Sequence, residues 1–396
     1  IVKINIAMVL LHGTNFRLLA RQTPANTLAS AYAFTSSSQK TLRTFASEYT
    51  NRNTLHFRSS SLSSAMPKSY STTLIKMSQN NDLESQISNK YLLSVEQCID
   101  MHKQNSKNMN VVFLDGSFHL GNGRNGRDEF ESGPRIQGAR YFDINDISSK
   151  EGSLLNPKGL PHMRPSKNLF AAAMSALQIT NNDHIIFYGT EGCLCVNRAA
   201  YTVQNMGHDQ SKLHLMQGSL TDWIDSGGEV ETNPVKVISA SELDDSDSTN
   251  HSYKATDATQ FCDFEEIMEV VKTGMEKNSS KAKAIILDAR GAGRFNGKTP
   301  EPREGLRSGH MPGAINIPFT NLVNPANPLK LKEQIDLRQA FQSAGVNIDD
   351  TETKLILSCG SGVTACVLAT ALQECGRDPS STFVYDGSWT EWGADP

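Results

Sequence analysis

The chain has 396 residues, which is enough for two domains of ordinary size, each with its own buried core. Its composition is that of a soluble globular protein, and its apolar runs fall well short of the roughly 20 residues of a membrane helix, so we expect no membrane partner. Residues 1–77 hold nine Lys or Arg and a single acid, and setting them aside leaves 29 basic and 41 acidic residues, a balance that argues against nucleic acid as a partner.

Residues 1–77 are rich in Ser, Thr, Arg and Ala, as is typical of a presequence that is cleaved after import into an organelle. The segment Arg43-Thr-Phe-Ala-Ser resembles a mitochondrial processing site, whereas Ala29-Ser-Ala-Tyr-Ala-Phe34 resembles the cleavage region of a plastid signal. A disordered extension without any address is a further alternative, and an internal start at Met66 or Met77 would give a cytoplasmic form. We expect a presequence or disordered extension over 1–77, and a mitochondrial protein.

An internal repeat defines the organisation of the rest of the chain. The segment Gly218-Ser-Leu-Thr-Asp-Trp223 reappears as Gly387-Ser-Trp-Thr-Glu-Trp392, a shift of 169 residues. Val112-Phe-Leu-Asp115 matches Ile285-Ile-Leu-Asp288 in the same order and at a similar spacing. Such matches indicate a duplicated domain.

Each half alternates short apolar runs, suited to buried parallel strands, with helical stretches. The expected strands are Val111–Leu114, Ile185–Tyr188, Leu213–Met216, Ile285–Leu287, Leu355–Leu357 and Phe383–Tyr385, and the expected helices include Leu169–Leu177 and Thr364–Glu374. This alternation predicts an α/β fold in which two tandem domains each form a parallel sheet covered by helices on both faces. The polar stretch 229–259 is interpreted as a linker between a first domain, 88–228, and a second domain, 260–396.

The seven cysteines are scattered and odd in number, which indicates a reducing compartment rather than a disulfide framework. Cys193-Leu-Cys195 has no second pair at zinc spacing, so we expect no metal. Cys366 and Cys375 stand among apolar residues of a predicted helix and are expected in the core. Cys359 differs because it stands at a turn from a strand into a helix.

The loop that follows Cys359 is suited to holding a nucleophilic sulfur. Backbone N–H groups and the dipole of the following helix favour the thiolate, which is the competent nucleophile. Gly360 and Gly362 let the backbone curl around the sulfur, Ser361 can donate a hydrogen bond to it, and Thr364 can serve as a hydroxyl donor or as the helix cap. A phosphatase would place an Arg directly after this loop, where this chain has an Ala, so we reject that alternative.

The loop Cys359-Gly-Ser-Gly-Val-Thr-Ala-Cys366 resembles the active loop of the mercaptopyruvate sulfurtransferases, a branch of the tandem-domain rhodanese family. The resemblance covers roughly residues 88–393. It implies transfer of sulfur from 3-mercaptopyruvate to a thiol such as thioredoxin or to cyanide, with a persulfide on Cys359, without metal or cofactor. Thiosulfate-using members carry basic residues after the Cys, where this chain has neutral ones. A thiosulfate sulfurtransferase and a non-enzymatic persulfide carrier remain alternatives.

A second segment, from Leu287 to Ala314, is similar to the family's substrate loop. The resemblance assigns Arg294 and Arg303 to the carboxylate and keto oxygen of mercaptopyruvate, a role that suits the planar guanidinium fork. The catalytic residues are then Cys359 and Ser361, and the substrate-binding residues are Arg294, Arg303, Gly360, Gly362, Val363 and Thr364. Asp288 is expected to anchor the loop, Arg290 to form a structural ion pair, and His310 to order a turn.

The chain departs from the family in its first domain. Many members have a His, assigned to proton transfer, where this chain has Arg135, so we expect Arg135 only to support anion binding at the domain interface. Arg124 is a second candidate to face the cleft. The repeat places Gly189 or Thr190 opposite Cys359, and Glu191 would repel an anion, so the first domain is predicted to be non-catalytic.

Overall fold

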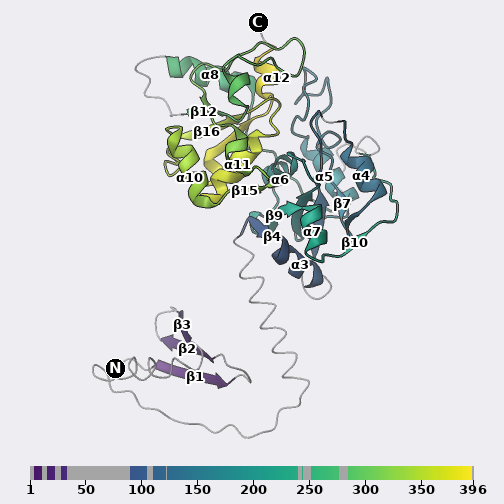
Figure 1. Ribbon diagram of the computed structural model, residues 1–396, viewed down its shortest axis with the longest axis vertical. Helices are drawn as coiled ribbons and strands as arrows, with labels where there is room; N and C mark the ends of the chain where they lie inside the picture. The colour runs from purple at the N-terminus through teal and green to yellow at the C-terminus, as the bar shows by residue number, and fades with distance from the viewer. Residues whose placement is uncertain are drawn as a thin grey trace, which may run out of the picture. The chain divides into compact units, whose positions relative to one another are not determined.

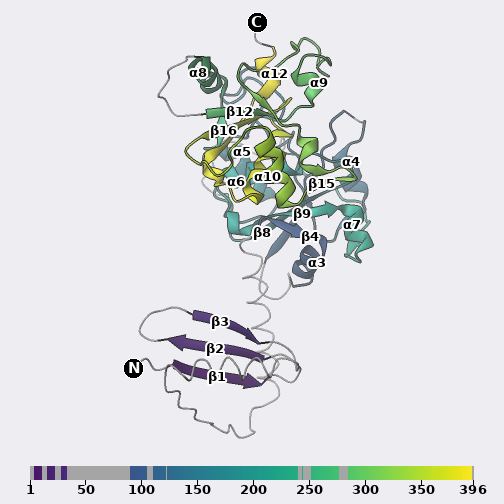
Figure 2. The same cartoon turned by 60° about the vertical axis from the view of Figure 1, so that its left-hand side comes forward.

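The computed structural model of the chain divides into two compact units, Ile1–Ile75 and Lys76–Pro396. The described residues are 4–10, 16–22, 28–33, 90–104, 110–121, 123–239, 243, 251–275 and 284–394. In the first unit, β1 (Ile4–Leu10), β2 (Phe16–Gln22) and β3 (Leu28–Ala33) form an antiparallel sheet, which Figure 2 displays. The remaining residues of the predicted presequence lie outside the described ranges.

The second unit contains two parallel five-stranded sheets built to the same plan (Figure 1). The first has the order β4-β9-β8-β5-β7 and the second β11-β17-β16-β12-β13, so each strand of one has a counterpart in the other. The first sheet comprises β4 (Leu92–Ser94), β5 (Val111–Asp115), β7 (Arg140–Tyr141), β8 (His184–Gly189) and β9 (Leu213–Ser219). The second comprises β11 (Phe261–Cys262), β12 (Ala284–Asp288), β13 (Ile315–Asn316), β16 (Lys354–Ser358) and β17 (Thr382–Tyr385). The predicted duplication and the two-sheet α/β fold are confirmed.

Helices cover both faces of each sheet because successive strand residues point to opposite sides and both sides are apolar. The first sheet packs against α5 (Lys167–Ala176) and α6 (Val196–Asn205) on one face and against α3 (Val95–Gln104) and α7 (Leu220–Asp225) on the other. The second packs against α10 (Gln334–Ser343) and α11 (Ala365–Glu374) on one face and against α8 (Phe264–Met275) and α12 (Ser388–Trp392) on the other. Helices α6 and α11 also contact each other, and so join the two halves. Within the described ranges, no helix is both long and apolar enough to span a membrane.

The strand register fixes which loops correspond between the halves. Asp115 pairs with Tyr188 in the first sheet, and Asp288 pairs with Ser358 in the second. The next residue along the chain is Gly189 in the first half and Cys359 in the second. The repeat analysis is therefore confirmed in placing Gly189, one of the two residues it allowed, at the position of Cys359.

Several short elements connect this framework. They are α4 (Gly126–Ser132), β6 (Arg135–Ile136) and β10 (Val230–Glu231) in the first half, and α9 (Ala292–Phe295), β14 (Val323–Asn324) and β15 (Asn327–Leu331) in the second. Strand β10 pairs antiparallel with β6. The beginning of the predicted linker 229–259 is thus hydrogen-bonded to the first half.

Candidate active site

Cys359 directly follows β16 and is only 2% exposed. Its backbone N–H donates to Ser388 Oγ at 3.2 Å, and its carbonyl accepts from the N–H of Trp389 at 3.0 Å. The Gly360 carbonyl accepts from the backbone N–H of Thr390 at 2.8 Å and from its hydroxyl at 2.6 Å. Four hydrogen bonds therefore fix the start of the loop against α12.

The rest of the loop presents donors that the protein leaves free. In the described part of the chain, none of the five successive backbone N–H groups from Gly360 to Thr364 donates to a protein acceptor, and the Ser361 hydroxyl has no partner either. The loop is largely buried, and a buried N–H without an acceptor is rare in proteins. Such a run of free amides is suited to an anion or an electron-rich sulfur. Thr364 stands at the N-cap position of α11, but its side chain makes no capping hydrogen bond, which leaves the expected alternative of a hydroxyl donor.

The two predicted substrate arginines converge on this loop. An idealised Cβ on Gly360 would lie 3.2 Å from Nη2 of Arg294 and 3.8 Å from Nη1 of Arg303. Arg294 also forms an ion pair with Glu301, a partner that the sequence did not identify. Arg303 has no ion pair within the described ranges, and its positive charge is therefore available to an anion.

The segment that carries these arginines is held by a buried ion-pair network. The Asp288 carboxylate accepts from the Arg290 backbone N–H at 2.9 Å and from its guanidinium at 2.6 Å, and Arg290 bonds Glu301 at 2.7 Å. The predicted roles of Asp288 and Arg290 are confirmed. His310 stacks on Phe295, with ring centroids 4.0 Å apart, and contacts its carbonyl at 2.8 Å, so it has the expected structural role.

A histidine that the sequence analysis did not identify lies within electrostatic reach of Arg303. His162 belongs to the first half, is buried, and has no hydrogen-bond partner at Nδ1. Burial, together with the positive charges of Arg198 and Arg303, lowers the pKa of His162 to about 3, so the ring is neutral at physiological pH. A neutral imidazole can donate one hydrogen bond and accept another.

The corresponding loop of the first half is closed by its own side chains. Arg124 donates to the Glu191 carbonyl and forms an ion pair with Glu129 at 2.7 Å, so it lies over this loop. Sγ of Cys193 is buried and accepts from the N–H groups of Phe118 and Cys195, each at 3.4 Å. Burial opposes ionisation of Cys193, but these hydrogen bonds outweigh it and lower its pKa. The loop has no free cradle comparable to that at Cys359.

Two other cysteines have the predicted core role. Cys366 and Cys375 are buried in the apolar cluster beneath α11. Burial raises the pKa of Cys366 to about 12 and that of Cys375 to about 11, so both thiols stay protonated at neutral pH.

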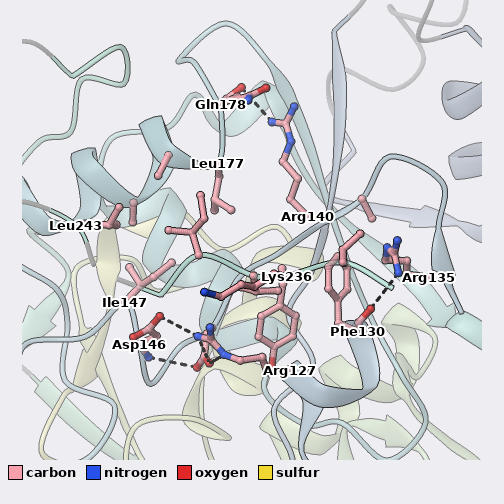
Figure 3. A pocket seen from close by; sticks show the side chains of 18 of the residues that line it. Arg127, Phe130, Arg135, Arg140, Asp146, Ile147, Leu177, Gln178, Lys236 and Leu243 are labelled. Carbon is pink, nitrogen blue, oxygen red and sulfur yellow. Dashed lines mark hydrogen bonds and ion pairs between the residues drawn. The ribbon is translucent and has the colours of Figure 1, made fainter. Parts of the chain in front are cut away.

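Arg135 is a structural residue in this fold, which corrects its expected role in anion binding at the domain interface. It is fully buried and donates to Glu231 at 3.0 Å, to the Phe130 carbonyl at 3.2 Å and to the Asn233 carbonyl at 2.7 Å. Figure 3 shows it bonded to Phe130 at the edge of a pocket of the first half, and that pocket is lined only by residues of the first half and the linker. Its donors are thus used in holding the linker, because Glu231 and Asn233 belong to it.

Comparison with known proteins places this site in a family. Residues 270–395 match the model of the rhodanese-like domain. The mitochondrial thiosulfate/3-mercaptopyruvate sulfurtransferase 1 of Arabidopsis thaliana is 32% identical over 304 residues, covering 75% of this chain and 76% of the relative. The 3-mercaptopyruvate sulfurtransferase of Escherichia coli is 34% identical, covering 68% of this chain and 84% of the relative.

Solved structures agree with these sequence matches. The 3-mercaptopyruvate sulfotransferase SseA of Escherichia coli superposes with a TM-score of 0.58 at 25% identity, covering 76% of this chain and 99% of that one. The sulfur transferase subunit of yeast mitochondrial complex I superposes with a TM-score of 0.59 at 30% identity, covering 76% and 96%. Since the duplicated fold, the cysteine loop and these relatives agree, the chain belongs to the thiosulfate/3-mercaptopyruvate sulfurtransferase family of rhodanese-fold enzymes.

Proposed function

We propose that this protein takes sulfur from 3-mercaptopyruvate onto Cys359 as a persulfide and passes it to a thiol or to cyanide. The observation that carries the proposal is the buried loop of free backbone N–H groups at Cys359, with two arginine side chains converging on Gly360. The amides suit a sulfur anion, and the guanidinium groups suit a carboxylate. The relatives from Arabidopsis thaliana and Escherichia coli bear names that include this donor.

The charge of the site favours mercaptopyruvate over thiosulfate as the donor. Of the two arginines that lie near Gly360, Arg294 is offset by Glu301, whereas Arg303 has no ion pair among the described residues. One uncompensated cation matches the single carboxylate of a keto acid better than the double charge of thiosulfate. The neutral residues Gly360 and Ser361 add no further positive charge.

The first half-reaction transfers sulfur to the enzyme. The Cys359 thiolate attacks the sulfur of 3-mercaptopyruvate, a new S–S bond forms, and the C–S bond breaks with its electron pair left on carbon. The product carbanion is the enolate of pyruvate, which Arg294 and Arg303 stabilise at its oxygens. The thiol proton of the donor balances the step, because the enolate must gain one proton to become pyruvate.

His162 is the group we propose to assist the enolate. The family resemblance assigns proton transfer to a histidine at the position that Arg135 takes in this chain. The Arg135 guanidinium bonds Glu231, Phe130 and Asn233 instead. The neutral ring of His162 lies within electrostatic reach of Arg303 and has a free nitrogen. A neutral imidazole that donates a hydrogen bond to a developing enolate oxygen lowers its energy without a charged acid.

The second half-reaction regenerates the thiol. An acceptor thiolate attacks the outer sulfur of the persulfide, and Cys359 leaves as a thiolate stabilised by the loop amides. We propose a small thiol or thioredoxin as the acceptor. A transfer assay with thioredoxin and its reductase, monitored by NADPH consumption, tests this part separately from pyruvate release.

Mass spectrometry of the purified protein tests the persulfide directly. After incubation with 3-mercaptopyruvate and no acceptor, the peptide containing Cys359 should gain the mass of one sulfur atom, and pyruvate should appear in equal amount. Cys359→Ser should show neither, whereas Cys375→Ser, a matched core cysteine whose sulfur lies away from the loop, should show both. Pyruvate release by the Cys359→Ser variant would contradict the proposal.

Two alternatives make different predictions in the same experiments. A thiosulfate sulfurtransferase would prefer thiosulfate in steady-state assays with both donors. A persulfide carrier would form the adduct on Cys359 but turn over poorly with small thiols, and it would discharge to one protein acceptor. The neutral loop and the two arginines favour our main proposal over both alternatives: mercaptopyruvate is the donor, and each enzyme molecule turns over many times.

We further propose a mitochondrial location. The basic composition of 1–77 supports it, and one relative is named as mitochondrial. A fluorescent fusion to the C-terminus of the full chain, compared with a fusion that starts at Met77, tests the address. Plastid fluorescence, or cytoplasmic fluorescence of both fusions, would contradict it.

A further inference from the structure

The first half contacts the cysteine loop directly, although its own loop lacks the nucleophile. The side chain of Val363 packs in the apolar cluster between the first sheet and α5 and α6. From α6, the side chain of Arg198 reaches the carbonyl of Gly362 at 3.2 Å. The loop that carries Cys359 is therefore held from both halves.

Arg198 is buried, and its guanidinium donates to three acceptors. Besides the Gly362 carbonyl, it donates to the His162 carbonyl at 2.6 Å and to Asp386 Oδ1 at 2.7 Å. Arg198 is 2% exposed and Asp386 is 0% exposed, so this ion pair is shielded from water. The other Asp386 oxygen accepts the backbone N–H of Arg164 at 2.8 Å. A charged group bonded in this way has one fixed position.

The bond to Gly362 determines the direction of a loop amide. In a trans peptide the C=O and the next N–H point in opposite directions. Because the Gly362 carbonyl is turned toward Arg198 of the first half, the N–H of Val363 is turned away from it. That N–H is one of the five loop donors that have no acceptor in the described part of the protein.

Glycine makes such a tether necessary. Gly362 has φ of +71°, which a glycine adopts freely, but the same freedom lets the neighbouring peptide rotate at low cost. An idealised Cβ on Gly362 would lie 2.7 Å from Nη1 of Arg198, so the guanidinium fits closely against this backbone. Without it, the Gly362 carbonyl would keep only the weak thiol donor of Cys366, at 3.3 Å.

We propose that Arg198, from the half without the nucleophile, is a positioning residue for sulfur transfer: it fixes the Gly362 carbonyl so that the Val363 N–H faces the sulfur on Cys359. This inference rests on the proposed persulfide at Cys359. It assigns to the first half a specific task in catalysis, since the donor array of the second half is complete only with Arg198 in place.

Substitution of Arg198 separates positioning from mere stability. Arg198→Met should lower kcat for pyruvate formation about tenfold or more, because preorganised donors act mainly on the transition state. Its KM for 3-mercaptopyruvate should change less than about twofold, since Arg294 and Arg303 remain. Arg198→Lys should recover part of the kcat, because an ammonium can donate to the same carbonyl. The persulfide on Cys359 should also decay faster in Arg198→Met when no acceptor is present.

Arg377→Met is the matched control. Arg377 is also buried and donates to the carbonyls of Ile348 and Asp350, at 3.1 and 2.9 Å, but it does not touch the loop. The Arg377→Met variant should have a lower midpoint of thermal unfolding but an unchanged kcat per folded molecule. Equal kcat losses in Arg198→Met and Arg377→Met, or a wild-type kcat in Arg198→Met, would overturn the proposal.

If Arg198→Met does not fold, the double variant Arg198→Met/Asp386→Asn replaces it, because it leaves no buried charge unpaired. A tenfold loss of kcat in the folded double variant supports the proposal, and a wild-type kcat overturns it. Wild-type enzyme and Cys359→Ser are assayed first. Pyruvate formation by Cys359→Ser would contradict the persulfide mechanism itself, whereas normal turnover by the Arg198 variants alone would contradict only the role of Arg198.

Discussion

The two halves place equivalent loops after equivalent strands, but the loops differ in how far their polar groups are hydrogen-bonded within the protein. In the first half, Arg124 bonds Glu129 and the Glu191 carbonyl, and the N–H groups near Cys193 donate to its sulfur. In the second half, five backbone N–H groups from Gly360 onward have no protein acceptor within the described residues. The two loops share a position in the fold, but the second presents a run of five successive donors that suits an anion or an electron-rich sulfur.

The largest effect expected from this comparison concerns the two cysteines. Cys359→Ser should reduce sulfur transfer by about a thousandfold or more, since a hydroxyl cannot accept sulfur at neutral pH. Cys193→Ser should retain wild-type turnover, because Cys193 is enclosed by its own loop. Steady-state pyruvate release measures both. A large loss in Cys193→Ser would mean that the first loop participates in the reaction.

Substitution of the arginine beside each loop should change kcat/KM by a smaller factor than substitution of Cys359. Arg303→Gln should lower kcat/KM for 3-mercaptopyruvate by about 10- to 100-fold, the range for loss of a charged hydrogen-bond partner. Arg124→Gln should leave kcat/KM within about twofold, because Arg124 already bonds Glu129 and the loop carbonyl. Comparable losses in both variants would show that the donor binds across both halves.

Much of the fold was predictable because buried parallel strands have a strong local pattern. The runs at 111–114, 355–357 and 383–385 were located within a residue or two, since each is apolar on both faces. The edge strands β4, β7, β11 and β13 were not predicted, because a strand of two or three residues has too few positions to show a pattern.

The site was predictable only where its residues are close together in the sequence. Cys359, Arg294 and Arg303 lie in motifs that were recognised from sequence alone. Arg198 was missed because it reaches the loop across the contact between the halves, which depends on the packing of α6 against α11. His162, whose carbonyl accepts from Arg198, was missed for the same reason. The prolines at 161 and 165 were the available sequence signal for His162. The buried ion pair of Arg198 with Asp386 has no signal in the sequence.

The two loop glycines offer a milder contrast. Gly192 and Gly362 both have positive φ, so replacing either by Ala costs about 1 kcal/mol of stability. A Cβ on Gly362 would also lie 2.7 Å from Arg198 Nη1 and 3.0 Å from the Asp386 carbonyl, so the loop must shift. Gly362→Ala should therefore lose about tenfold in turnover, whereas Gly192→Ala should lose stability alone. Unchanged turnover in a folded Gly362→Ala would show that the loop tolerates displacement.

The smallest expected effect is a difference in acid sensitivity between the halves. Burial is the main cause that lowers the pKa of His162 to about 3 and those of His208 and His214 to about 4, and all three belong to the first half. The second half, 260–396, contains a single histidine, His310, which is exposed. Protonation of buried histidines should therefore affect the first half.

The direction of the stability change follows from the number of protons that the folded and unfolded states bind. As the pH falls below about 6.5, these histidines bind protons in the unfolded state but not in the folded state, so stability decreases until the pH reaches the folded pKa values. Between pH 7 and 6 the loss should be less than about 1 kcal/mol per histidine. Asp115, whose pKa burial raises to about 6, binds a proton in the folded state over the same pH range and so offsets part of this loss. Hydrogen exchange of the full chain at both pH values should show faster opening of β8 and β9 than of β16 and β17, and equal changes in the two sheets would contradict the expectation.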